Sequence, residues 1–122
     1  MREVRAFISG CADLSLTQDE RDFLRQHRPW GLILFGRNIK DRAQVKEITS
    51  QFREIVGRED APVLIDQEGG RVQRMKAPEW PRYPAAAEFS AAPEGERAYC
   101  VRQGARLIAR DLAEVGINVD CM

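Results

Sequence analysis

The sequence predicts an α/β fold with about four parallel strands and intervening helices. Four short, largely apolar segments, at residues 5–9, 31–35, 61–65 and 116–120, have the length and composition of buried strands. Between them, apolar residues recur at helical spacing. The resulting order is strand, helix, strand, helix, strand, loop, helix, strand, and alternation of this kind produces parallel strands.

The first two helices have clear start and stop signals. Thr17 and Glu20 form a Thr-x-x-Glu capping box that opens a helix over residues 18–27. Asp41 can cap the second helix, which Gly57 stops. The apolar face of this second helix consists of Val45, Ile48, Phe52 and Ile55.

The third helix is expected to begin near Pro93 and to end at Gly116. Its spacing predicts a buried face made of Val101, Ala105, Ile108, Leu112 and Val115.

Residues 68–92 interrupt this regular order. They form a connection of about 25 residues rich in Pro, Gly and Arg, and loops of this length without regular structure are often functional. The connection follows the carboxyl end of the third strand, where parallel α/β folds place their ligand sites. We therefore expect the functional region here.

A carboxylate and two arginines lie at the start of this connection. Asp66 is placed at the end of the third strand, and a carboxylate can accept hydrogen bonds from two neighbouring sugar hydroxyls. Arg71 and Arg74 bring planar, multi-donor guanidinium groups to the same rim. Gly69 and Gly70 allow a sharp turn and a close approach to a ligand. Spacing alone favours a structural role, in which Asp66 caps the following turn and pairs with a surface arginine.

Other candidate residues have weaker support. Asp66 and Glu68 are a conceivable acid/base pair, but two residues apart in an irregular segment they need not converge. Trp80 is either a platform for sugar stacking or, as we favour, an anchor for the loop. His27, the only histidine, is expected at the end of the first helix, where it interacts with the helix dipole.

Composition argues against several functional classes. Lys and Arg number 19, as do Asp and Glu, and this balance argues against a nucleic-acid partner. Three widely spaced cysteines indicate neither a metal site nor a disulfide framework. The glycine motifs of phosphate and dinucleotide loops are missing, so no cofactor is expected. A charged N-terminus and short apolar runs predict a cytoplasmic chain with no membrane partner.

Residues 65–74, Ile-Asp-Gln-Glu-Gly-Gly-Arg-Val-Gln-Arg, resemble the cytoplasmic β-N-acetylhexosaminidases of glycoside hydrolase family 3, which act in peptidoglycan recycling. Residues 31–38, the Trp80-Pro81 pair and residues 116–120 agree with the same family. The resemblance covers essentially all 122 residues, but only the first part of the family's length.

The resemblance implies that residues 1–122 are the N-terminal, incomplete portion of a (β/α)8 TIM-type barrel, which typically needs about 250 residues. It implies a retaining enzyme, monomeric when complete, that removes terminal β-linked N-acetylglucosamine from muropeptides. Asp66 and Arg74 match the family's sugar-binding positions, with Arg71 and Glu68 as supporting residues. No metal or cofactor is implied.

The family's nucleophilic aspartate and its acid/base histidine lie further along, so the resemblance places no catalytic residue in this chain. We expect this chain to be part of a larger enzyme and to be inactive on its own. The two open edges of the sheet predict that the chain alone is marginally stable, aggregation-prone or oligomeric. The alternatives are a non-catalytic α/β module that binds a sugar or another ligand, and a structural domain whose long loop forms an interface.

Overall fold

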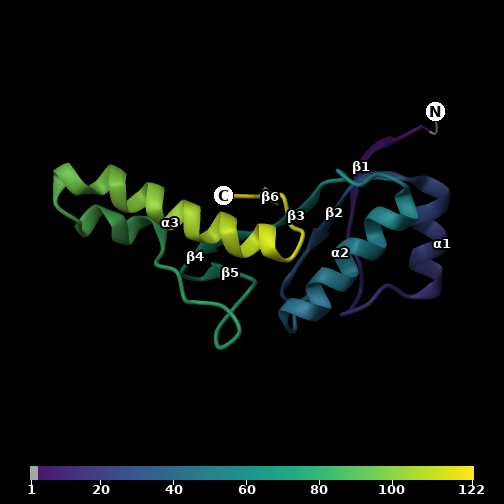
Figure 1. Cartoon of the computed structure of the whole chain (residues 1–122), viewed down its shortest axis with the longest axis horizontal. Coiled ribbons are helices and arrows are strands. Elements are labelled where there is room, and N and C mark those ends of the chain that lie inside the picture. Colours follow the sequence, from purple (N-terminus) through teal and green to yellow (C-terminus); the bar gives the residue numbers. More distant parts are fainter. Residues whose placement is uncertain (1–2) are drawn as a thin grey trace.

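The computed structural model describes residues 3–122 and contains a four-stranded parallel sheet (Figure 1). Its strands lie in the order β1 (Arg5–Ser9), β2 (Pro29–Leu34), β3 (Val63–Ile65) and β6 (Val119–Asp120). All three pairings are parallel, and Ile65 is in register with Leu34 on one side and with Asp120 on the other. The predicted fold class of parallel strands is therefore confirmed, and three strands end together at one edge of the sheet.

Three α-helices alternate with these strands: α1 (Gln18–His27), α2 (Arg42–Val56) and α3 (Glu94–Glu114). At α1 the Thr17 hydroxyl accepts the Glu20 backbone N–H at 3.2 Å, and the Glu20 carboxylate accepts the Thr17 N–H at 2.8 Å. Asp41 caps α2 by accepting the Gln44 N–H at 2.8 Å, and Gly57 ends that helix with φ +69°. The capping signals in the sequence therefore set these helix ends.

The main core lies between the central strands and the helices that pack on them. Leu32, Ile65 and Phe52, from β2, β3 and α2, have no exposed surface. Met75 and Trp80 belong to the same core although they come from the long connection after β3. This connection is therefore held by apolar burial as well as by hydrogen bonds.

The strands differ in burial, and the expectation that all four are buried strands is wrong for β1. β3 is buried along its whole length, whereas β1 is mostly exposed and Ile8 is 44% exposed. β1 is an outer strand, so it has a neighbour on one side only. Trp30 on β2 is also 43% exposed and lies with Ile8 around a shallow apolar hollow.

The buried face of α3 is shorter than predicted. Ile108 and Leu112 are buried, as is Val115 just after the helix, but Val101 is 49% exposed and Ala105 is also exposed. The cause is visible in Figure 1, where the first part of α3 extends beyond the sheet. Although α3 has 21 residues, no helix within residues 3–122 is long and apolar enough to cross a membrane.

The long connection contains regular structure, so the expectation of a structureless loop is wrong. β4 (Gln67–Gly69) and β5 (Val72–Gln73) pair as an antiparallel hairpin, and a 3-10 helix, η2 (Ala86–Ala91), precedes α3. Gly69, the last residue of β4, and Gly70, in the turn, have φ +98° and +60°, a backbone conformation that glycine adopts without strain. The hairpin begins one residue after Asp66, so it determines what surrounds that carboxylate.

Candidate functional site

The candidate site lies where β3 and β6 end. Asp66 follows β3 directly, and Asp120 ends β6 in register with Ile65. Two hydrogen bonds tie these strand ends together: the Cys121 N–H donates to the Ile65 carbonyl at 2.8 Å, and the Gln67 N–H donates to Asp120 Oδ1 at 2.9 Å. Both aspartates therefore belong to the carboxyl edge of the sheet, where parallel α/β folds bind ligands.

Asp66 and Arg74 form an ion pair at this edge. Arg74 Nη2 donates to Asp66 Oδ2 at 3.1 Å, and the two side chains are 31% and 25% exposed. The structure thus brings together the two residues that the sequence placed on one rim. Because both side chains remain partly exposed, a ligand hydroxyl can reach the pair and compete for both partners. The carboxylate would accept and the guanidinium would donate.

The alternative that Asp66 has only a structural role is confirmed in one respect. Asp66 does pair with an arginine, Arg74, but within the described chain it accepts no hydrogen bond from the turn that follows it. Its second carboxylate oxygen and its exposed surface are not used to cap a turn. This leaves Asp66 with hydrogen-bonding capacity toward a ligand.

Gln67 positions the backbone that carries Arg74. Its side chain has no exposed surface, and its Oε1 accepts the N–H groups of Arg74 at 2.9 Å and of Met75 at 3.0 Å. Its Nε2 donates to the Met75 carbonyl at 3.0 Å. Sequence reasoning did not identify this residue, because nothing in a single sequence distinguishes a buried, fully bonded glutamine from an exposed one.

Arg71 and Glu68, the predicted supporting residues, form no hydrogen bond or ion pair with Asp66 or Arg74 in the part of the chain that the structure describes. Both are exposed, and neither makes a side-chain hydrogen bond or ion pair within the residues that the structure describes. Arg71 lies at the hairpin turn and lines a separate pocket. Glu68 acts on the site only through its charge, which contributes to raising the pKa of Asp120.

Asp120 is a third carboxylate of this region that sequence reasoning missed. Burial raises its pKa above the ordinary value of 3.8, and the charges of Asp66 and Glu68 add to this effect, while the hydrogen bond from Gln67 opposes it. Its Oδ2 is buried and has no hydrogen-bond partner among residues 3–122. The signal that identifies Asp66, an aspartate at the end of a predicted strand, also applies to Asp120. No group of three or more His, Cys, Asp or Glu side chains able to hold a metal occurs in the described residues.

The other residues singled out in the sequence, Trp80, Gly69 and His27, have structural roles. Trp80 is only 2% exposed and the Arg42 guanidinium lies 5.4 Å from its ring centre, so it is a loop anchor, as favoured, and its ring is not open for sugar stacking. A Cβ at Gly69 would lie 2.2 Å from the Pro84 carbonyl oxygen, so the close approach at this glycine is to the loop itself. His27 ends α1, as predicted.

The profile described as "Glycosyl hydrolase family 3 N terminal domain" matches residues 2–121. A curated β-hexosaminidase of Xanthomonas oryzae pv. oryzae is 36% identical over 117 residues, covering 92% of this chain and 34% of the relative. A β-hexosaminidase of Pseudomonas aeruginosa is 36% identical over 104 residues, covering 85% and 30%. The chain therefore spans about a third of the length of these relatives.

Two solved structures are similar to this chain over nearly its whole length. NagZ from Neisseria gonorrhoeae in complex with N-trifluoroacetyl-D-glucosamine superposes with a TM-score of 0.86 and 26% identity, covering 98% of this chain and 36% of that one. A glycoside hydrolase family 3 β-N-acetylglucosaminidase from Paenibacillus sp. str. FPU-7 superposes with a TM-score of 0.81 and 28% identity, covering 95% and 22%. The fold of this chain matches part of each.

Proposed function

Because the chain belongs to the family of glycosyl hydrolase family 3 N-terminal domains, we propose that it forms part of the sugar-binding site of a β-N-acetylhexosaminidase. The complete protein would remove terminal β-linked N-acetylglucosamine from peptidoglycan-derived muropeptides. The names of its relatives support the enzyme class, and the glucosamine derivative bound to the Neisseria protein supports the sugar.

The Asp66–Arg74 pair carries this proposal. It lies at the carboxyl edge of a parallel sheet, its atoms are 3.1 Å apart, and both side chains remain partly exposed. Asp66 would accept hydrogen bonds from neighbouring sugar hydroxyls, and Arg74 would donate to the same ring. Arg71 and Glu68 would support the rim of the site.

In this proposal the chain supplies binding groups and no catalytic group. A retaining glycosidase needs a nucleophile and an acid/base residue, and hydrolysis then proceeds through a covalent glycosyl-enzyme intermediate. These groups would come from the two thirds of the relatives' length that this chain does not span. We place the reaction in the cytoplasm, with a carbohydrate as the only partner, no cofactor, and a monomeric complete enzyme.

The test is sugar binding by the full 122-residue chain, measured by saturation-transfer difference NMR with N-acetylglucosamine. The wild-type chain should bind, and Asp66→Asn and Arg74→Gln should each weaken binding about tenfold or more, because each removes a hydrogen bond made by a charged group. Asp60→Asn removes one carboxylate charge at an exposed position after α2, away from the pair, and is the control. It should bind as the wild type does.

Equal binding by the wild type and both site variants would remove Asp66 and Arg74 from the sugar site. Binding that is lost in both variants and retained by Asp60→Asn would support their assignment.

A further inference from the structure

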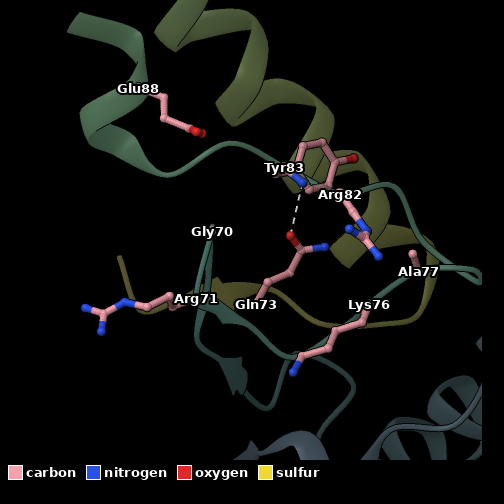
Figure 2. Close-up of a pocket in the computed structure, with 8 residues that line it drawn as sticks. All are labelled: Gly70, Arg71, Gln73, Lys76, Ala77, Arg82, Tyr83 and Glu88. Atoms are coloured by element: carbon pink, nitrogen blue, oxygen red, sulfur yellow. Dashed lines mark hydrogen bonds between the residues drawn. The ribbon is translucent and has the colours of Figure 1, made fainter.

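A pocket lies between the β4–β5 hairpin and the chain that leads into η2 (Figure 2). Its volume is about 500 Å³. The side chains and glycines that line it are Gly70, Arg71, Gln73, Lys76, Ala77, Arg82, Tyr83 and Glu88. Neither Asp66 nor Arg74 is among them, so this pocket is separate from the candidate sugar site.

The pocket concentrates positive charge in a chain whose total charge is balanced. Arg71, Lys76 and Arg82 line it against a single carboxylate, Glu88. One oxygen of that carboxylate already accepts the Ala85 N–H at 2.9 Å. The pocket therefore has an excess of two positive charges.

The three cations also have no internal partner. All three side chains are exposed, and none makes a hydrogen bond or ion pair to another residue within positions 3–122. Arg42 and Arg74, which lie nearby, are both paired with carboxylates. The donors of the pocket are consequently available to a ligand.

Hydrogen bonds hold the backbone segments that carry these cations. Gln73 is 5% exposed, and its Nε2 donates to the carbonyls of Met75 at 2.8 Å and Pro81 at 2.7 Å. Its Oε1 accepts the Tyr83 N–H at 3.0 Å. Gln73 thus fixes the chain on both sides of Arg82 and just before Lys76. The Gly70 N–H, which donates to the Tyr83 carbonyl at 2.8 Å, fixes the turn next to Arg71.

The cations are spread around the pocket. In Figure 2, Arg71 and Arg82 lie on opposite sides of Gln73, with the Arg71 side chain directed away from it, while Lys76 lies below Gln73 and Glu88 above it. A single small anion would not contact all three, whereas a ligand with several separated anionic groups can. Tyr83 adds no negative charge, because burial and its hydrogen bond to Asp111 raise its pKa.

We propose that this pocket binds a small ligand that carries several carboxylates. Two arginines suit this chemistry because a guanidinium donates two parallel hydrogen bonds to a carboxylate, and the lysine adds a point charge. The ligand is either a free polycarboxylate or a short acidic peptide. This inference does not depend on the sugar-binding proposal, because Asp66 and Arg74, the residues proposed to bind the sugar, do not line this pocket.

The test is isothermal titration calorimetry on the full chain at constant ionic strength, with citrate and with triglutamate as probes and trialanine as the neutral control. The triple variant Arg71→Gln, Lys76→Gln, Arg82→Gln should weaken binding about tenfold, since each exposed ion pair contributes roughly two- to threefold. The matched control, Arg102→Gln, Arg106→Gln, Arg110→Gln, removes three exposed charges from α3. It should change affinity less than about threefold.

Binding of citrate alone would assign a free polycarboxylate, and binding of triglutamate would assign an acidic peptide. Either result, with selective loss in the pocket variant, supports the proposal. Absence of binding by both probes, or equal weakening in the two triple variants, would overturn it, because the second result indicates general electrostatic attraction.

Discussion

Replacing Gln67 by Leu tests whether its buried amide holds the hairpin that carries Arg74. Leu is similar in size but makes no hydrogen bonds, so the N–H groups of Arg74 and Met75 would lose their acceptor. The Met75 carbonyl would keep its bond from Gln73 at 2.8 Å. A buried donor without a partner costs about 1–3 kcal/mol, and Arg74 is only half-buried. We expect a loss of about 2–4 kcal/mol in the free energy of unfolding.

Urea denaturation followed by circular dichroism measures this change. Gln26→Leu, at an exposed position of α1, is the matched control and should stay within about 0.5 kcal/mol of the wild type. If Gln67→Leu were as stable as this control, the amide would not be needed, and our account of how Arg74 is positioned would be wrong.

Three further predictions follow from particular positions. Gly69→Ala should lower the free energy of unfolding by about 2 kcal/mol or more, because φ at Gly69 is +98° and the new Cβ would lie 2.2 Å from a carbonyl oxygen. Gly95→Ala is the control and should not lower it, because no atom lies within 4 Å of a Cβ there. Equal unfolding midpoints for the two variants would contradict this prediction. Asp120→Asn should stabilise the chain at pH 7. The pKa of Asp120 is raised in the folded chain, so folding disfavours its charged form. The stability gained by Asp120→Asn should therefore vanish below pH 3.8. If the variant were still more stable than the wild type there, the raised pKa would not be the cause. Ile8→Lys should reduce self-association through the exposed outer strand β1. Sedimentation velocity measures this self-association, and a wild-type chain that stays monomeric at high concentration would contradict the expectation.

Helix ends were predictable because their causes are local. The Thr17–Glu20 capping box involves residues three positions apart, and Asp41 and Gly57 act on the adjacent turns of α2. Such interactions form in the same way whatever lies elsewhere in the fold. The same holds for the order of strands and helices along the chain, which follows from alternating local patterns.

Burial was less predictable because it depends on neighbours. Val101 and Ala105 continue the apolar spacing of α3, yet they are exposed because that part of the helix extends past the sheet. Ile8 belongs to an apolar strand, yet it is exposed because β1 lies at the edge. A hydrophobic pattern identifies the side of an element that suits burial, but packing determines what covers it.

The sequence by itself determined the α/β class, the order of the elements, and Asp66 and Arg74 as the leading candidates. Only the tertiary structure decided that these two residues pair, that Gln67 holds the backbone of Arg74, and that Asp120 joins the same edge. The Gln67–Asp120 contact shows the reason. Its partners are 53 positions apart in the chain and meet only because β3 and β6 are neighbours in register.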